Sequence, residues 1–467
     1  MSASTKMKGI VRIRYVLLTA FVIRLVVPLF AAFLNQDLTL FHSPDTSSYV
    51  NPAKELISSW QFGSDGTPEI ERTPGYPLLL IPGIILDNTE LVTITLQIIL
   101  SCLTVYLVFK TALLLSERHK IAVLCALLYS VEPLSVLYTS KLLTETSFTC
   151  MIVLFLYFLL KYMKTGSLRQ LLIALFALCA SVYIRPISYF LPVITAFILL
   201  CSALAKRQIR SKPLFHTCVF ITVAISLIAL WQIRNMIETG YSGFSAITDT
   251  NLYFYQGASV LAVQQGISFY EMQDQMGYRD REVYLANHPE QRSWSQGRRY
   301  RYMRKQGIKI LTQYPATYLG IHLKGMLRTL LGPGATEYLK LFKLYPESGG
   351  LPGVIVGKGI SKSLIFILKE KPLVFWSNIL LGLILAFYLF FGGIALLWKK
   401  FIKNISVITL LSVGIYFLII SGGPHTYSRF RHPIMPILCI LSGYGLAGVS
   451  TRFRKVIAPH KLRGLMT

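Results

Sequence analysis

The stretch TYSRFRHPIMP, residues 426–436, places Arg429 and Arg431 two positions apart between two long apolar runs. A guanidinium group can bind two phosphate oxygens at once, an arrangement that lysine cannot copy. Arg185 in YIRPIS and Arg234 in WQIRN also stand at the ends of apolar runs. These four arginines predict a site for a phosphate-bearing ligand, and the alternative is that each contacts lipid headgroups.

Composition indicates the surroundings of these arginines. Hydrophobic residues make up 53% of the 467-residue chain and charged residues only 15%, with a mean hydropathy of +0.54. These values predict an all-α polytopic membrane protein. The net charge of +26 does not indicate a nucleic acid as partner, because the sequence contains no recognisable nucleic-acid-binding motif. The seven cysteines never occur in C-x-x-C spacing, so we interpret them as small hydrophobic residues.

The apolar runs predict a bundle of about 10–12 transmembrane helices, since each span needs about 20 apolar residues. Two segments, 316–332 and 351–368, account for the difference between ten and twelve. Arg24 lies in the middle of the first span, and we interpret it as a side chain that extends to the lipid headgroups. The ten principal candidates lie near residues 15–34, 91–109, 121–138, 142–160, 170–184, 187–205, 213–233, 373–398, 404–421 and 433–450.

Loop charges predict that both termini are cytoplasmic. The two termini and the loops predicted on their side carry 21 basic residues and one acidic residue, whereas residues 35–90 carry eight acidic and two basic residues. Short basic loops stay on the cytoplasmic side of a membrane. The chain is therefore predicted in the inner (plasma) membrane, with Asp45, Glu145 and the four arginines at its periplasmic or exterior face.

Two outer segments are long enough to be more than connectors. In the first, 35–90, Asn51 and Pro52 resemble a helix N-cap followed by proline at the first helical position. We expect an amphipathic helix over 52–60, along the outer membrane interface. The second segment, 237–372, contains the aromatic cluster NLYFYQG and the basic run RRYRYMRK, and is predicted to form an outer lid.

These features divide the chain into three parts. Residues 1–236 form a predicted N-terminal transmembrane catalytic module that includes the first outer loop. Residues 237–372 form the outer region with its two additional candidate spans. Residues 373–467 form the last transmembrane helices and a basic cytoplasmic tail.

Several motifs occur in a characteristic order: PDTSSY around Asp45, RTPGYPLLL from Arg72, YTSKLLTETSF around Glu145, YIRP, WQIRN and RFRHPIMPILCILSGYGL. With this set the chain resembles the GT-C glycosyltransferases, in particular the clan of protein O-mannosyltransferases and lipid A aminoarabinose transferases. The resemblance covers most of the spans and implies a GT-C-like bundle. It also implies a membrane enzyme that moves a sugar from a polyprenyl-phosphate-linked donor to a hydroxyl of a glycan, lipid or protein.

An enzyme of this kind needs a carboxylate to take the acceptor proton and cations around the leaving phosphate. Asp45 is the expected base, and a loop or capping aspartate is the alternative. Glu145 is expected to orient the acceptor or hold a cation, and a helix N-terminal acid is the alternative. Arg72 is expected beside the acids, and Tyr76 either lines the sugar pocket or simply packs.

The remaining expected substrate contacts are cationic or polar side chains near the donor phosphate: Arg185, Arg234, His425, Arg429 and Arg431. Of the last two arginines, Arg431 is favoured because it stands closer to the membrane span. The leaving phosphate needs no protonation, so the paired carboxylates of a glycosidase are not expected. The sequence requires no cofactor. A divalent cation remains an alternative, although Asp45 stands alone where many relatives of the GT-C clan have an acidic pair, which argues against a metal requirement.

Two other functions compete with sugar transfer from a monophosphate-linked donor. One is a flippase for lipid-linked sugars or another secondary transporter, and the other is an O-antigen-ligase-like transferase with a diphosphate-linked donor. A transporter should have ionisable residues near the membrane midplane and two similar halves, whereas here most charges gather at one face. The sequence contains no P-loop, H-E-x-x-H or G-x-S-x-G motif, which argues against ATP-driven transport, zinc proteolysis and serine hydrolysis.

Overall fold

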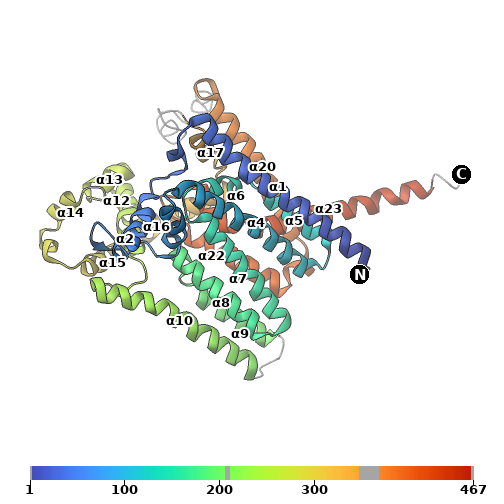
Figure 1. Cartoon of the computed structure of the whole chain (residues 1–467), viewed down its shortest axis with the longest axis horizontal. Helices are drawn as coiled ribbons and strands as arrows, with labels where there is room; N and C mark the ends of the chain where they lie inside the picture. The colour runs from blue at the N-terminus through green and yellow to red at the C-terminus, as the bar shows by residue number, and fades with distance from the viewer. Residues whose placement is uncertain (1–2, 206–210, 346–367, 464–467) are drawn as a thin grey trace.

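The computed structural model describes residues 3–205, 211–345 and 368–463. Helices dominate these residues, and their only strands are the hairpin pair β1 (Gly63–Ser64) and β2 (Thr67–Pro68). Figure 1 shows a bundle of long helices, with both ends of the chain on one side and the short helices of the predicted lid on the opposite side. The prediction of an all-α polytopic membrane protein is confirmed.

Seven helical segments of the described residues are long and apolar enough to cross a membrane. They lie in α1 (Ala3–Asn35), α4 (Thr89–Ser116), α7 (Glu145–Thr165), α9 (Leu191–Ala205), α10 (Ser211–Thr239), α20 (Pro372–Leu396) and α23 (Met435–Arg463). Three apolar helices are shorter: α3 (Gly75–Ile85), α8 (Leu168–Ile184) and α22 (Ile405–Ile420). Each of the ten principal predicted spans overlaps a helix or a bent helix pair.

One predicted span, 121–138, is a bent pair instead of a straight helix. The pair consists of α5 (His119–Ser130) and the short helices α6 (Pro133–Leu137) and η2 (Tyr138–Ser140), with a bend of 58°. A break of this kind leaves the last carbonyl groups of the first helix without their helical partners. These carbonyls need donors inside the bundle, where water is scarce.

Arg24 supplies such donors, and the prediction that it reaches the headgroups is wrong. Its side chain is completely buried. Its Nε donates to Ser101 Oγ over 2.7 Å, while its Nη1 donates to the carbonyl of Ser130 over 2.7 Å. Its Nη2 donates to Ser135 Oγ over 2.9 Å. Arg24 therefore stabilises the end of α5 and the start of α6 at the bend.

The outer region contains no span among its described residues. Its helix α16 (Pro315–Leu331) is not apolar enough to cross a membrane and carries Lys324 and Arg328. The other candidate, 351–368, lies outside the described residues except for its last position. The remaining helices of this region are α11 (Ile247–Thr250), η4 (Asn251–Gly257), α12 (Ala258–Gln265), α13 (Phe269–Gln275), α14 (Arg281–Asn287), η5 (Pro289–Ser293), α15 (Gln296–Gln313) and α17 (Ala335–Leu341).

The first outer loop forms η1 (Leu38–Phe41) and α2 (Ser47–Ser59) before the hairpin. The amphipathic helix was expected at 52–60, with Asn51 as its cap, so both the cap and the start are wrong. Pro52 lies inside α2. Proline removes one backbone donor, a cost that a helix tolerates near its first turns. The earlier start places Asp45 in the turn directly before α2.

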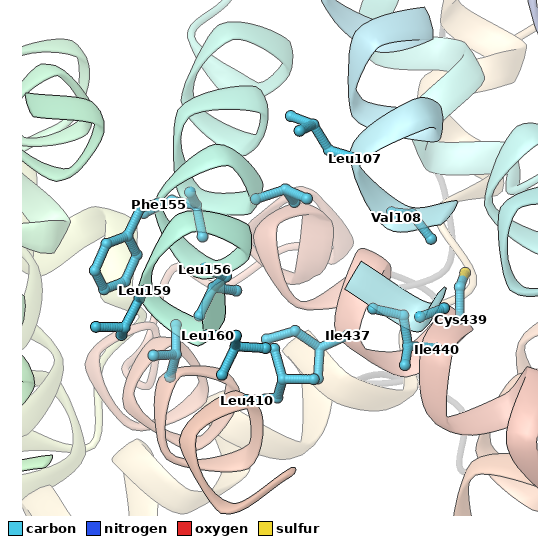
Figure 2. Packing of buried hydrophobic residues seen from close by; sticks show 14 of the residues in the cluster. Leu107, Val108, Phe155, Leu156, Leu159, Leu160, Leu410, Ile437, Cys439 and Ile440 are labelled. Atoms are coloured by element: carbon cyan, nitrogen blue, oxygen red, sulfur yellow. The ribbon is translucent and has the colours of Figure 1, made fainter. Parts of the chain in front are cut away.

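The core between the long helices is tightly packed. Figure 2 shows Phe155 and Leu160 of α7 among side chains of α4, α22 and α23. Glycine allows α20 and α23 to approach closely, because a Cβ atom at Gly445 would collide with the carbonyl of Phe391. This packing holds the outer helix ends in fixed positions. The remaining short elements are η3 (Pro186–Ser188), α21 (Lys399–Ile402) and η6 (Ser428–Ile434).

The predicted orientation can be tested at two exposed threonines. Thr67 lies in the hairpin of the outer loop, and Thr165 lies at the predicted cytoplasmic end of α7. We expect an impermeant maleimide to label T67C but not T165C on intact cells, in a background without other cysteines. Permeabilised cells should label both variants, which controls for thiol reactivity. Equal labelling on intact cells would contradict the predicted topology.

Candidate active site

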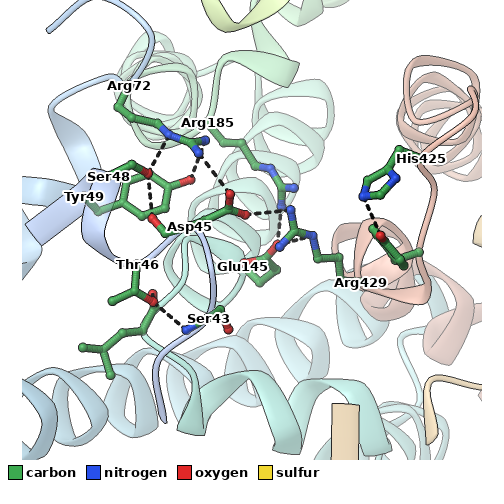
Figure 3. A network of polar contacts seen from close by, with 12 residues as sticks. Ser43, Asp45, Thr46, Ser48, Tyr49, Arg72, Glu145, Arg185, His425 and Arg429 are labelled. Atoms are coloured by element: carbon green, nitrogen blue, oxygen red, sulfur yellow. Dashed lines mark hydrogen bonds and ion pairs between the residues drawn. The ribbon is translucent and has the colours of Figure 1, made fainter. Parts of the chain in front are cut away.

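Five predicted site residues come together at the helix ends that are predicted to face the exterior, and we call them the charged cluster (Figure 3). Three arginines surround two carboxylates, which leaves a net positive charge. Each residue belongs to a different segment of the chain. The cluster consists of Asp45 before α2, Arg72 before α3, Glu145 at the start of α7, Arg185 after α8 and Arg429 in η6.

Asp45 is held by two of the arginines. Its Oδ1 lies 3.1 Å from Arg72 Nη2 and its Oδ2 lies 2.9 Å from Arg429 Nη2. Burial raises the pKa of Asp45, but the positive charges of Arg429 and Arg72 outweigh burial and lower this pKa overall. The side chain keeps 30% of its exposure. Asp45 is therefore an ionised carboxylate that a ligand can still reach.

The turn that carries Asp45 is fixed to the segment before α7. Thr46 Oγ1 accepts from the backbone N–H of Ser43 over 2.9 Å and donates to the carbonyl of Leu142 over 3.1 Å. The N–H of Leu142 donates to the carbonyl of Phe41 over 3.0 Å. These bonds set the distance between the turn and the segment that leads into Glu145.

Arg72 braces Asp45 from the other side. Its Nε donates to Ser48 Oγ over 2.9 Å and its Nη1 to Tyr49 Oη over 3.2 Å. Its guanidinium carbon lies 4.7 Å from the centre of the Tyr49 ring. Ser48 and Tyr49 belong to the motif PDTSSY, of which sequence reasoning used only the aspartate. No sequence signal singled out these two residues, because the helix was expected to start only at residue 52.

Glu145 begins α7, as predicted. Its side chain is almost completely buried. Its Oε1 lies 2.9 Å from Arg185 Nη1 and 3.9 Å from Arg429 Nε, whereas its Oε2 has no hydrogen-bond partner in the structure. A buried carboxylate oxygen without a donor is costly. This oxygen is the one carboxylate oxygen of the charged cluster that accepts no hydrogen bond from a described residue.

Arg431 does not join the charged cluster, so the preference for Arg431 over Arg429 is wrong. Its buried Nη1 donates to the carbonyls of Thr329, Leu330 and Gly332, over 2.8, 3.0 and 2.9 Å. These carbonyls end α16, where helical partners are missing. Both arginines lie in the 3₁₀-helix η6, in which residues two apart point in different directions.

Two other predicted residues also lie outside the charged cluster. Arg234 donates to the carbonyls of Glu69 and Phe62 over 2.7 and 2.5 Å, and so ties α10 to the first outer loop. Tyr76 is completely buried and its hydroxyl donates to Gln97 over 3.2 Å. Tyr76 therefore packs in the core, which was the alternative expectation.

His425 lies beside Arg429 (Figure 3), and its ring packs against Tyr255 and Phe269 of the predicted lid. Its Nε2 is 2.5 Å from the hydroxyl of Tyr427. Burial lowers the pKa of His425, and the positive charge of Arg429 lowers it further. The imidazole is therefore neutral at physiological pH, and it offers polar contacts without adding charge.

The donor set does not fit a divalent cation. Hard cations are bound by several oxygen ligands, mainly carboxylates. Both Asp45 oxygens and one Glu145 oxygen already face guanidinium groups. Among the described residues, no group of three His, Cys, Asp or Glu side chains could hold a metal ion.

We therefore expect chelation to leave sugar transfer unchanged. The arginines already supply the positive charge that a metal ion would bring. The measurement is transfer in the presence of EDTA, followed by addition of Mg²⁺ or Mn²⁺ as the matched control. A loss with EDTA that either ion restores would contradict this expectation.

Comparison with known proteins identifies the fold. Residues 72–231 match the family model described as dolichyl-phosphate-mannose-protein mannosyltransferase, a segment that includes Arg72, Glu145 and Arg185. The oligosaccharyltransferase AglB of Archaeoglobus fulgidus, solved with an inhibitory peptide and a dolichol-phosphate, matches over 99% of this chain with a TM-score of 0.54. The chain has the GT-C fold. The resemblance to GT-C membrane glycosyltransferases predicted from the sequence is confirmed.

The likeness is one of fold, because sequence identity to AglB is only 14%. The apo form of the same oligosaccharyltransferase gives a TM-score of 0.52 at 14% identity, covering 96% of this chain and 52% of that chain. ArnT of Cupriavidus metallidurans, bound to undecaprenyl phosphate, covers 98% of this chain and 80% of its own at 13% identity, with a TM-score of 0.37.

The match with AglB covers 52% of the AglB chain, so this GT-C chain spans about half of the length of AglB. A search of curated proteins finds no match.

Proposed function

We propose that this GT-C chain transfers a sugar from a polyprenyl-phosphate-linked donor to an acceptor hydroxyl at the extracytoplasmic face of the membrane. The observation that carries the proposal is the charged cluster, in which three guanidinium groups surround two carboxylates. Its excess positive charge suits a phosphate group. The family description names a dolichyl-phosphate sugar, and one AglB structure contains dolichol-phosphate.

Arg429 and Arg185 are the proposed phosphate ligands. One terminal nitrogen of Arg185 donates a hydrogen bond to Glu145. The guanidinium carbon of Arg185 also lies 5.4 Å from the centre of the Phe430 ring. Its second terminal nitrogen makes no hydrogen bond to any other described residue. As the sugar departs, the bond between its anomeric carbon and the phosphate oxygen breaks, and the phosphate gains negative charge. Guanidinium groups already in place stabilise this charge.

Asp45 is the proposed general base. The acceptor oxygen forms its bond to the anomeric carbon while its proton moves to the Asp45 carboxylate. An aspartate with a lowered pKa is a weak base, but the acceptor proton becomes acidic as the new bond forms. Glu145, with its unpartnered Oε2, is proposed to orient the acceptor hydroxyl.

The lipid that copurifies with the protein tests this function. A monophosphate-linked sugar, together with transfer from that lipid in reconstituted protein, would support the proposal. A diphosphate-linked glycan would favour the ligase-like alternative. Movement of a lipid-linked sugar across vesicles without any transfer would favour a flippase or secondary transporter. The lipids should be identified by mass spectrometry, with the R429A variant as the control for binding at the charged cluster.

A further inference from the structure

Five partly exposed or half-buried rings lie together between the lid and the loop before η6, and we call them the aromatic wall. Tyr255 is 5.3 Å from His425 between ring centres, and His425 is 4.7 Å from Tyr427. Phe269 is 6.1 Å from both Tyr255 and His425. Tyr278 completes the wall, and its hydroxyl lies 2.5 Å from that of Tyr255.

A rigid element positions Tyr255. It belongs to η4, a seven-residue π-helix, and π-helical turns are rare and occur often at functional sites. This turn packs closely on α15, because a Cβ atom at Gly307 would lie 2.8 Å from the backbone of Leu252. The residues before Tyr255, Tyr253 and Phe254, are buried in the lid core. Tyr255 itself is half-buried at the edge of that core.

The aromatic wall adjoins the charged cluster. Figure 3 shows His425 of the wall on the same side of the site as Arg429, and burial raises the pKa values of Tyr255 and Tyr427, so both hydroxyls are neutral. Tyr427 is two positions from Arg429 and remains 45% exposed. The wall therefore presents ring surface and neutral polar groups next to the proposed base and phosphate ligands.

This combination suits a sugar ring. One face of a pyranose carries C–H groups that pack on aromatic surface, while its hydroxyls need polar partners. We propose that the aromatic wall binds a sugar ring beside Asp45, either the sugar of the donor lipid or a sugar of the acceptor. The proposal rests on the proposed function and names the chemical class that the site receives. If the rings only fasten the lid to the bundle, their removal leaves sugar binding unchanged.

Binding to protein in nanodiscs tests the proposal and separates the two sources. The first arm compares the affinity for undecaprenyl phosphate with that for undecaprenyl-phosphate mannose and undecaprenyl-phosphate glucose. The second arm measures methyl α-mannoside and methyl β-glucoside in the presence of saturating undecaprenyl phosphate. If the wall is a donor subsite, wild-type protein should bind a sugar-bearing lipid more tightly than bare undecaprenyl phosphate in the first arm. If the wall is an acceptor subsite, wild-type protein should bind a methyl glycoside in the second arm.

The Y427A variant should bind the sugar about 3- to 10-fold more weakly than wild-type protein, which is the scale of one aromatic contact. Y427F keeps the ring and should keep the affinity, whereas W60A removes an exposed aromatic outside the wall and serves as the matched control. Binding of bare undecaprenyl phosphate should be equal in all four proteins, because the phosphate ligands are intact.

Two results overturn the proposal while the proposed function stands. One is Y427A that keeps the full sugar affinity, and the other is wild-type protein that binds the bare lipid but recognises none of these sugars. If wild-type protein does not bind undecaprenyl phosphate at all, the proposed function fails and the wall proposal fails with it.

Discussion

Sugar transfer should fall by about 10²-fold or more when Asp45 is replaced by asparagine, the scale of a lost general base. Asparagine keeps the shape of the side chain but cannot take up the acceptor proton. The lipid donor should still bind, because Arg185 and Arg429 remain. Initial transfer rates and donor binding, measured on the same purified variant, check both parts of this prediction.

The matched control for this change is Asp65→Asn. Asp65 lies in the exposed turn of the same outer loop, and its positive φ of 54° is tolerated by asparagine. This variant should transfer sugar at the wild-type rate. If Asp45→Asn also kept the wild-type rate, Asp45 would not be the base, and Glu145 would become the next candidate.

The lowered pKa of Asp45 fixes the direction of the pH dependence. The charges of Arg429 and Arg72, acting against burial, hold the pKa below the usual value of 3.8. The ionised form, which is the active one, persists above this lowered pKa and is lost as the pH falls through it. The transfer rate should therefore stay level between about pH 7 and pH 5, provided that the protein remains folded.

Arg429→Lys should lower transfer by about 10- to 10²-fold, the range of one charge-assisted contact of about 1.5–3 kcal/mol. Lysine keeps the positive charge but cannot contact Asp45, Glu145 and a phosphate with one planar group. Arg429→Ala should remove nearly all activity. Transfer rates at matched expression check these expectations.

Arg328 on the exposed face of α16 provides the control, and Arg328→Lys should be silent. The competing explanation for Arg429 is a contact with lipid headgroups, which lysine makes as well as arginine. Full activity of Arg429→Lys would favour that explanation. If Arg429→Lys loses transfer activity while Arg328→Lys keeps it, the result would instead indicate that the planar guanidinium group of Arg429 binds the phosphate.

Arg185 and Arg429 were predictable because charged residues at the ends of apolar runs are conspicuous, and Asp45, Arg72 and Glu145 were predictable from the motifs that carry the family resemblance. The choice between Arg429 and Arg431 failed because it depends on side-chain direction within a 3₁₀-helix. Ser48 and Tyr49 escaped notice because such residues are common in loops, and only the folded first turn of α2 places them against Arg72.

Hydropathy predicted the helices of the bundle well, because apolar length is a strong local signal. It could not predict the bend between α5 and α6. That bend depends on Arg24, which reaches carbonyl groups more than 100 positions away in the sequence. Interpreted alone, Arg24 looked like a charge that must leave the membrane, since its partners belong to other helices.

The scattered origin of the charged cluster has a consequence for biosynthesis. The chain is made and inserted from its N-terminus, so Asp45 leaves the ribosome 384 residues before its partner Arg429. Until the last hairpin of α22 and α23 packs, Asp45 lacks one of its two cations, and Glu145 has Arg185 but not the more distant Arg429 beside it. Under the proposed function, competence to bind the donor is therefore acquired only in the final step of assembly, when Arg429 reaches Asp45.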